Sequence, residues 1–359
     1  MSHGSAGDDI VATHEEAAAN EREPLVVVAP LQAFLDEHGL GSGALDLEPI
    51  GEGHSNVTYR VTRADGSSLV LRRPPRGPLP PSAHDVLREA RLLRALAPTP
   101  ARVPKVLAVG DDPGVIGAPF YVMEEVAGDV ITNDMPPALD TPQQRAAIAD
   151  ELIDALVEVH AVDWRAVGLE GFGKPTGYLE RQLRRFGGLW EHNRTRDLPQ
   201  VERVGRWLAD HLPQSPPATI VHGDYRLGNV MLAAQPPARL VAIFDWEMAT
   251  IGDPLADLGY LATMWIEADD PPMTFELSRV TRLPGFPTRE ELIARYEERS
   301  GRSMTDIRWY QTLAVWKSVV FMEGNYKRAV AGTTDDPYLK TFGDGVVELA
   351  DRAEAITRG

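Results

Sequence analysis

The 359-residue sequence contains no cysteine. Disulfide bonds, thiolate zinc sites and cysteine nucleophiles are therefore excluded, and the chain suits a reducing compartment. Hydrophobic residues make up 43% of the chain and charged residues 25%, which is ordinary for a globular protein. The length is sufficient for two compact lobes that are stable without disulfide bonds or structural metal sites.

Positive charge is scarce. The chain has 36 Lys and Arg residues against 53 Asp and Glu residues, which gives a formal net charge of −17. Nucleic acids and anionic membrane surfaces are bound by basic patches, so we expect neither nucleic acid nor membrane as a partner. The acidic balance is compatible with a cationic substrate, although solubility is the simpler interpretation.

Long apolar segments are absent as well. No apolar run reaches the roughly 20 residues that a bilayer-spanning helix needs. The polar, acidic amino terminus has no apolar segment of the kind found in signal peptides, so we expect a cytoplasmic protein. Residues 1–24 carry six acids against one arginine and little apolar content, which predicts a flexible acidic tail.

Short alternating segments dominate residues 25–126 and predict a small antiparallel sheet with one inserted helix. An additional short helix is expected from Leu31 to about Gly41, before the sheet begins. The inserted helix is expected over 84–96, after a proline-rich link. The strands are expected over residues 47–50, 57–61, 68–72, 103–110 and 120–124.

The turn between the first two of these strands is rich in glycine. It runs from Gly51 to Asn56 and includes Gly53 and Ser55. A tip of this kind can bring backbone N–H groups close to phosphate oxygens. Most Gly-x-Gly turns only reverse the chain, so the turn by itself is weak evidence for a nucleotide.

A basic and an acidic residue in the same region are candidates for an ion pair. Arg72 ends the third predicted strand, and Glu89 lies on the inserted helix. Pairing with Glu89 would brace Arg72 as a cation that contacts phosphate. The alternative is a solvated acid on an amphipathic helix, and only motifs further along the chain decide between the two.

Residues 127–359 are predicted to be mainly helical. Thr141-Pro142 is a favourable start for a long helix that ends near His160, which we interpret as a structural histidine. Trp309 and Trp316 recur at helical spacing and predict a core-facing stripe. The other helices are expected over residues 178–190, 201–212, 258–266, 289–300 and 306–331.

The residues best suited to chemistry lie between positions 220 and 257. Asp224 follows His222-Gly223, Asn229 comes five positions later, and Asp245 follows a second apolar segment. Phosphoryl transfer needs one carboxylate to receive a hydroxyl proton, together with an Asn and an Asp to hold magnesium. The spacing H-x-D-x-x-x-x-N followed by a metal-binding Asp is typical of kinases.

With these motifs in order, the chain from about residue 47 to 332 resembles the aminoglycoside phosphotransferase family, whose members share the bilobal protein-kinase-like fold. The strongest matching segments are VHGDYRLGN (221–229), IFDWE (243–247) and GDPLADL (252–258). The closest subgroup is that of the kinase-like proteins associated with acyl-CoA dehydrogenases. Its matching segments are VLRRPP (70–75), FG (172–173), YLERQ (178–182) and 324–329.

The resemblance implies an α+β fold with two lobes. The N-lobe, residues 25–126, would hold the antiparallel sheet, the inserted helix and the hinge. The C-lobe, residues 127–359, would be larger, mainly helical, and carry the catalytic loop, the metal site and the acceptor pocket. ATP and Mg²⁺ are the implied cofactors.

The family's roles carry over to matching positions of this chain. Asp224 is implied to be the catalytic base or the group that orients the hydroxyl. Asn229 and Asp245 are the implied magnesium ligands. Arg72 is the implied contact to the α- and β-phosphates, braced by Glu89.

The remaining implied roles concern nucleotide binding and support. Gly51 to Asn56, with Gly53 and Ser55, would cover the phosphates. The backbone of Glu124 to Val126 would contact adenine. His222 is expected to shape the catalytic loop, and residues 253 and 257, both Asp, are expected to be structural.

The sequence departs from the family pattern at two places. Arg72 stands where a lysine is usual, which keeps the charge and changes the hydrogen-bond geometry. Trp246-Glu247 stands where protein kinases have Phe-Gly, and no segment resembles their activation loop. A protein substrate is therefore disfavoured.

Three functions remain open at this point. The first is an ATP-dependent phosphotransferase acting on a small-molecule hydroxyl, with a hydroxyacyl-CoA acceptor suggested by the subgroup and Arg181, Arg184 and Arg185 as candidate anion contacts. The second is an aminoglycoside or amino-alcohol kinase, which acidic residues around the acceptor would favour. The third is a nucleotide-binding pseudokinase. The subgroup also suggests a functional link to a separate acyl-CoA dehydrogenase, and the sequence leaves the oligomeric state open.

Overall fold

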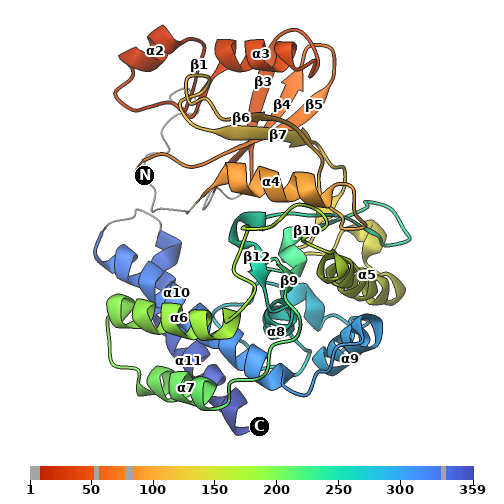
Figure 1. The fold of residues 1–359 in the computed structure, drawn as a ribbon, viewed down its shortest axis with the longest axis vertical. Helices are drawn as coiled ribbons and strands as arrows, with labels where there is room; N and C mark the ends of the chain where they lie inside the picture. Colours follow the sequence, from red (N-terminus) through yellow and green to blue (C-terminus); the bar gives the residue numbers. More distant parts are fainter. Residues whose placement is uncertain (1–8, 52–55, 78–83, 333–336) are drawn as a thin grey trace. The chain divides into compact units, whose positions relative to one another are not determined.

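The computed structural model describes residues 9–51, 56–77, 84–332 and 337–359 (Figure 1). The chain divides into two compact units. Unit 1 comprises Met1–Thr99 and Val103–Ala127, and unit 2 comprises Pro100–Arg102 and Gly128–Gly359. The chain passes from the first to the second after Ala127, beside the boundary expected from the sequence.

Unit 1 is built on a five-stranded antiparallel sheet with the strand order β3-β4-β5-β7-β6, as the sequence predicts. Alternate side chains of the strands enter a core that includes Tyr59, Val61 and Leu71. The strands are β3 (Leu45–Ile50), β4 (Val57–Arg63), β5 (Ser68–Arg73), β6 (Val106–Gly110) and β7 (Phe120–Glu124).

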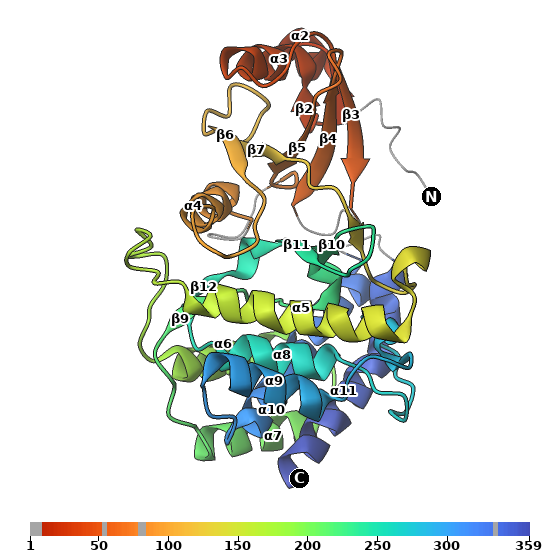
Figure 2. The ribbon, with the colours of Figure 1, turned by 90° about the vertical axis from the view of Figure 1, so that its right-hand side faces the viewer.

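Two helices accompany this sheet, and β6 and β7 lie between them in both views (Figures 1 and 2). Helix α3 (Val28–Glu37) buries Leu31 and Leu35, one turn apart on the same face. Helix α4 (Val86–Leu96) begins after Asp85, whose side chain accepts a hydrogen bond from the Arg88 backbone N–H. Helix α4 packs against β6 and β7 and presents Glu89 on its buried face.

The described part of the predicted flexible tail is structured, which corrects that expectation for residues 9–24. Strand β1 (Ile10–Val11) pairs in parallel with β2 (Val26–Val27). Helix α2 (His14–Ala19) follows and is capped by Thr13, whose hydroxyl accepts from the Glu16 backbone N–H. Two acids of this segment, Glu15 and Glu16, lie in the first turn of α2, where the helix dipole favours them.

Unit 2 is mainly helical. Its long helices are α5 (Pro142–Ala161), α6 (Tyr178–Asn193), α7 (Pro199–Asp210), α8 (Leu255–Met264), α9 (Arg289–Ser300), α10 (Ile307–Val330) and α11 (Phe342–Arg358). Its short helical turns are η1 (Pro137–Leu139), η2 (Leu227–Asn229), η3 (Trp246–Met248), η4 (Arg279–Arg282) and η5 (Pro337–Thr341).

Helix α10 is the centre of unit 2. It packs against α6, α7, α8 and α11, and Figure 2 shows α10 among the stacked helices of this unit. The predicted core stripe is confirmed, since Trp309, Leu313, Trp316 and Val320 are all buried. Helix α11 was not predicted, although Val346, Leu349, Ala350 and Ala353 form a helical apolar stripe that packs on α10.

Short strands connect these helices and position the motif residues. Strand β9 (Thr219–Val221) pairs with β12 (Thr250–Gly252), and β10 (Val230–Leu232) pairs with β11 (Leu240–Ile243) and β8 (Asp129–Val130), all antiparallel. Among the described residues, no helix is both long and apolar enough to cross a membrane.

Candidate active site

The His222-Gly223-Asp224 turn leaves β9 and is held by one buried carboxylate. Asp257 accepts hydrogen bonds from the backbone N–H groups of His222 at 2.7 Å and Gly223 at 2.8 Å. Gly223 has φ +90°, and a Cβ at this position would lie 3.0 Å from Met248. Only glycine fits this conformation without strain, so the turn geometry depends on Gly223.

His222 shapes the same turn from inside, which confirms its predicted structural role. Its Nδ1 accepts from the Asp224 backbone N–H at 3.2 Å, so its proton lies on Nε2, which donates to the Phe244 carbonyl at 2.8 Å. The ring also packs against Trp246, with the centroids 4.6 Å apart. His222 therefore links the Asp224 turn to the segment that carries Asp245.

Asp257 is itself oriented by a buried network. His160 Nε2 lies 3.2 Å from Asp257 Oδ2, and Tyr296 OH lies 2.6 Å from His160 Nδ1. Burial lowers the pKa of His160, and the charge of Asp257 offsets only part of this shift. Burial alone would raise the pKa of Asp257, but the hydrogen bonds from His160 and the backbone bring the net pKa below its usual value. A neutral His160 thus donates to an ionised Asp257.

This network predicts a loss of stability in acid. The unfolded chain takes up a proton on His160 below about pH 6.5, whereas the folded chain resists protonation, so stability falls as the pH falls below that value. The site contributes a slope of up to about 1.4 kcal/mol per pH unit. His160→Gln, which keeps a donor and an acceptor, is expected to remove this contribution. Urea unfolding at pH 7.5 and pH 5.5 measures it.

The matched control for this experiment is His211→Gln, because His211 is an exposed histidine of the same unit. The control is expected to keep the pH slope of the unmodified protein. An unchanged slope in the His160 variant would contradict the buried, neutral state assigned to His160.

Asp224 and Asn229 lie in direct contact. Asn229 Nδ2 donates to both the backbone carbonyl and the Oδ2 atom of Asp224, each at 2.8 Å. These two bonds fix the orientation of the amide, since only its nitrogen can donate. Asn229 Oδ1 accepts no hydrogen bond from the described residues, so this oxygen remains available as a ligand atom.

The β10–β11 hairpin brings the segment that carries Asp245 next to Asn229. Val230 is in register with Ile243, and the Phe244 backbone N–H donates to the Asn229 carbonyl at 2.9 Å. Asp245 directly follows this bond and adopts φ 63°, the left-handed region that residues other than glycine rarely occupy. Such backbone strain is concentrated at functional sites, where the surrounding structure holds it in place.

The donor set around this hairpin fits a hard divalent cation. Amide and carboxylate oxygens, as supplied by Asn229 and Asp245, are ligands that Mg²⁺ prefers. Within the described ranges, no group of three or more His, Cys, Asp and Glu side chains could hold a metal ion. A magnesium ion held by these two residues would complete its coordination with phosphate oxygens and water.

Unit 1 contains the predicted Arg72–Glu89 ion pair. Arg72 Nε lies 3.0 Å from Glu89 Oε2, and Arg72 Nη1 donates to Thr58 Oγ1 at 3.3 Å. The Glu89 side chain is 2% exposed and that of Arg72 is 14% exposed, so the pair is shielded from solvent and is not a solvated surface contact.

The glycine-rich turn is described only in part. Gly51 ends the segment after β3 with φ +89°, and Asn56 is buried before β4. Gly53 and Ser55, the other candidates in this turn, lie outside the described residues. The positive φ of Gly51 fits a tight turn, and the phosphate role of the turn stays a prediction.

The predicted adenine-binding segment follows β7. The Glu124 backbone N–H donates to the Lys105 carbonyl at 3.0 Å, so this donor is already used. The backbone groups of Val126 form no hydrogen bond within the described residues, and Val126 is only half-buried. Glu125 is anchored to β4 through Arg60, with Nε 2.6 Å from Oε1. The Val126 backbone can therefore pair with a ligand, and the adenine-binding role of this segment stays a prediction.

Several residues around Asp224 were missed by the sequence analysis. Arg226 Nε lies 3.7 Å from Asp224 Oδ1. Tyr260 of α8 is half-buried, and desolvation together with the charge of Asp224 raises the pKa of its hydroxyl well above the usual value. Arg226 follows Asp224 by two positions in the motif, which is a signal that could have identified it. Tyr260 follows the GDPLADL segment, where only a helix was predicted.

Two cationic side chains of unit 2, Lys317 and Arg185, both lie close to Phe186. Lys317 Nζ lies 4.9 Å from the centroid of the Phe186 ring, and the Arg185 guanidinium lies 5.9 Å from the same centroid. Burial lowers the pKa of Lys317 to about 8, and the charges of Asp257 and Asp224 act against that shift. Arg181, by contrast, donates to backbone carbonyls of its own segment. Lys317 could not be singled out from the sequence because it lies within the aromatic core helix.

Three features of the chain are typical of kinase-like phosphotransferases that act on small-molecule hydroxyl groups. They are a loop carboxylate paired with an amide, an aspartate that follows the next hairpin, and an Arg–Glu pair between a five-stranded sheet and its helix. A family model described as the phosphotransferase enzyme family matches residues 46–306. The chain belongs to this family.

The relatives extend this result. Acyl-CoA dehydrogenase family member 10 of Mus musculus is 34% identical over 327 residues, which cover 90% of this chain and 30% of the relative. Acyl-CoA dehydrogenase family member 11 of Rattus norvegicus is 31% identical over 341 residues, which cover 92% of this chain and 43% of the relative. The chain thus spans less than half the length of these relatives, and the predicted subgroup is confirmed.

A solved structure agrees with the fold. A protein of Ralstonia eutropha, provisionally assigned as an aminoglycoside phosphotransferase, is 31% identical to this chain with a TM-score of 0.79. The match covers 92% of this chain and 97% of the solved one. The predicted kinase-like α+β fold is therefore confirmed.

Proposed function

We propose that this chain transfers the γ-phosphate of ATP to a hydroxyl group of an anionic small molecule, and that hydroxyacyl-CoA compounds are the principal acceptor class. The observation that carries the proposal is the contact of Asp224 with Asn229 beside Asp245. A carboxylate fixed in this way can orient an acceptor hydroxyl and receive its proton.

Four candidate residues of unit 2 have defined parts in this reaction. Asn229 Oδ1 and the Asp245 carboxylate would hold magnesium, which when bound neutralises charge on the phosphate oxygens. The Asn229 amide holds Asp224 in place, and Asp257 fixes the turn through two backbone N–H groups. Asp224 then orients the acceptor oxygen for in-line attack and accepts its proton.

The nucleotide is assigned to residues of unit 1. Arg72 contacts the α- and β-phosphates, and Glu89 restricts its guanidinium to one orientation. The backbone of Val126, which has no partner within the described residues, pairs with the adenine edge.

Removing the Glu89 carboxylate from its ion pair with Arg72 is expected to weaken ATP binding more than it slows phosphate transfer. Glu89→Gln removes the carboxylate charge that braces the Arg72 guanidinium, so the KM for ATP is expected to rise by roughly tenfold, in line with the loss of a charge-assisted hydrogen bond. Steady-state kinetics at varied ATP concentration measure this effect. The matched control is Glu48→Gln, which loses a more exposed carboxylate that pairs with Arg60. Equal KM values in both variants would contradict the role of Arg72.

Cations near Asp224 favour an anionic acceptor over an aminoglycoside. Arg226 and Lys317, which interact with Asp224, and Arg185, which interacts with Lys317, would repel a polycationic amino sugar and attract phosphate or carboxylate groups. An aminoglycoside or amino-alcohol acceptor, the alternative from the sequence, would be supported by a ring of unpaired acids around Asp224. The names of the relatives also support an acyl-CoA acceptor and a link to a dehydrogenase reaction.

Lys317→Met is therefore expected to raise the KM for an anionic acceptor by roughly tenfold and to leave the KM for ATP unchanged. The reason is the loss of a half-buried cation from the acceptor side of the site. Initial rates with a hydroxyacyl-CoA measure the effect. Lys340→Met, which removes an exposed lysine of unit 2, is the control. A KM that is unchanged or lower in the Lys317 variant would contradict an anionic acceptor.

A screen that follows phosphomonoester formation tests the whole proposal. Hydroxyacyl-CoA compounds, free hydroxy acids, amino alcohols and aminoglycosides form the panel, with Mg²⁺ and ATP present. Transfer to the anionic members is expected. Transfer to cationic members alone would favour the alternative, and magnesium-dependent ATP binding without any transfer would favour a pseudokinase.

A further inference from the structure

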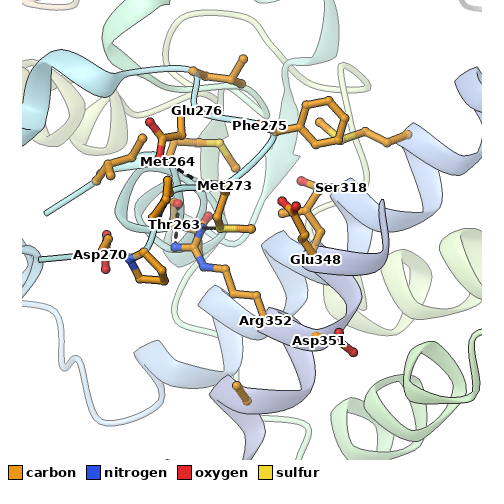
Figure 3. A pocket seen from close by; sticks show the side chains of 17 residues that line it. Thr263, Met264, Asp270, Met273, Phe275, Glu276, Ser318, Glu348, Asp351 and Arg352 are labelled. Atoms are coloured by element: carbon orange, nitrogen blue, oxygen red, sulfur yellow. Dashed lines mark hydrogen bonds between the residues drawn. The ribbon is translucent and has the colours of Figure 1, made fainter. Parts of the chain in front are cut away.

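A cavity of about 630 Å³ lies in unit 2, lined by the end of α8, residues 266–277, α10 and α11 (Figure 3). Most of its lining is apolar, and the lining includes Met264, Met273, Phe275, Met322 and Leu349. This size and character are typical of pockets that bind small organic ligands. Methionine side chains suit flexible hydrocarbon ligands because they are themselves adaptable.

One cation from α11 enters this apolar surrounding. Figure 3 shows Arg352 extending toward Thr263 and Met273. Its Nη2 donates to the Thr263 carbonyl at 3.0 Å, and its Nη1 lies 3.7 Å from Met273 Sδ. Within the described residues, no carboxylate lies within 4.0 Å of its guanidinium, and burial lowers the pKa of Arg352 to about 10. A half-buried cation in this state gains from a bound anion.

Two acids of the lining are already neutralised by other arginines. Asp270 pairs with Arg289, and Glu276 pairs with Arg282 at 2.5 Å. These carboxylates therefore contribute little net charge to the cavity, and they do not compensate Arg352.

The other two acids of the lining are exposed to solvent. Glu348 accepts hydrogen bonds from the backbone N–H and hydroxyl of Thr274, and Asp351 accepts one from Gln200. Exposed carboxylates stay hydrated and interact weakly with a ligand beneath them. Arg352 is thus the charged group that determines the ligand charge in the apolar part of the cavity.

We propose that this cavity binds an amphipathic carboxylate, with a medium-length hydrocarbon chain against the methionine and phenylalanine side chains and the carboxylate on Arg352. Guanidinium groups match carboxylates in shape and can form two parallel hydrogen bonds with them. The proposal goes beyond the phosphoryl transfer proposed above and does not depend on it.

The cavity begins one helical turn from the candidate active site. Thr263 and Met264 follow Tyr260 on α8 by three and four residues and so lie on a neighbouring part of its surface. Tyr260 interacts with Asp224. Binding in the cavity and catalysis are nevertheless separable, because Asp224 is not part of the lining.

Isothermal titration of the full chain with three ligands of equal chain length tests the charge preference. Octanoate is expected to bind more tightly than octanol, and octanol more tightly than octylammonium. Octylammonium binding as tightly as octanoate would overturn the proposal, because the exposed acids would then dominate. Absence of octanoate binding at millimolar concentration would also overturn it.

Variants of Arg352 test whether this residue binds the ligand carboxylate. Arg352→Met is expected to weaken octanoate binding by roughly ten- to one-hundredfold and to leave octanol binding within a factor of about two, as loss of a charged hydrogen bond implies. Arg352→Lys is expected to retain part of the affinity. Arg358→Met, on the exposed surface of the same helix, is the control and is expected to bind like the unmodified protein. Equal octanoate affinity in the two methionine variants would overturn the proposal.

Two further measurements distinguish loss of the binding site from loss of folding or of phosphate transfer. Thermal unfolding of each variant shows whether it folds, and the lysine variant serves if the methionine variant does not. Asp224→Asn is expected to lose transfer and retain octanoate binding. Loss of phosphate transfer with octanoate binding retained would contradict only the proposed function. Loss of octanoate binding with phosphate transfer retained would contradict only the proposed cavity ligand.

Discussion

Replacing Asp224 with Asn is expected to lower kcat by roughly 10²- to 10⁴-fold, the range that positioned general bases contribute. The substitution removes the proton acceptor and keeps a side chain of the same shape. An amide oxygen at this position can still accept the hydrogen bond from Asn229 Nδ2, so the turn is expected to persist. The KM for ATP is expected to stay within about threefold, because Asp224 is assigned to the acceptor hydroxyl and not to the nucleotide.

Rapid-quench kinetics measure the transfer step directly in this variant. The matched control is Asp269→Asn, which removes an exposed carboxylate of the same unit and is expected to leave kcat unchanged. A kcat near that of the unmodified protein in the Asp224 variant would remove Asp224 from the mechanism.

Replacing Asp245 with Asn is expected to abolish most magnesium-dependent turnover, with a loss of at least roughly 100-fold, since a metal ion contributes several kcal/mol to transition-state stabilisation. Asparagine tolerates the left-handed backbone conformation better than most residues, so the φ of 63° can persist. The loss would then be a loss of the anionic ligand. Titration of the rate with Mg²⁺ is expected to show a much higher half-saturating concentration.

Two further variants of Asp245 distinguish the loss of a metal ligand from a change in backbone conformation. Asp245→Gly keeps the conformation and provides no ligand, so its turnover is expected to be as low as that of the asparagine variant or lower. Asp245→Ala adds strain at positive φ and is expected to lower the unfolding temperature as well. If the glycine variant retained full magnesium-dependent turnover, Asp245 would not be a metal ligand.

The parts of the fold with strong periodicity could be predicted from the sequence. The strand containing Tyr59 and Val61 alternates cleanly, and the Thr141-Pro142 start of α5 is bounded by a cap that forms as expected, with Thr141 accepting from Gln144. Helix α4 was also predicted with Glu89 on it, and the ion pair with Arg72 is present. Local patterns suffice for such elements because their burial follows the chain period.

What the sequence could not provide depends on contacts between distant segments. Asp257 supports the His222 turn from 35 positions away, and His160 supports Asp257 from 97 positions away. Asp245 adopts its left-handed conformation after the hairpin and next to Trp246, which packs on His222. Within the described residues, Arg352 has no carboxylate within 4.0 Å, and two nearby acids, Asp270 and Glu276, pair with other arginines, which no local pattern records.

The most direct test of the account follows the γ-phosphate of ATP by phosphorus NMR, with Mg²⁺ and a hydroxyacyl-CoA acceptor, in the unmodified protein and in the Asp224→Asn variant. The account predicts a new phosphomonoester signal together with ADP in the unmodified protein, and at least roughly 100-fold slower appearance of both in the variant. Phosphomonoester formed at equal rates by the two proteins, or ATP bound with magnesium and never transferred by either, would contradict it.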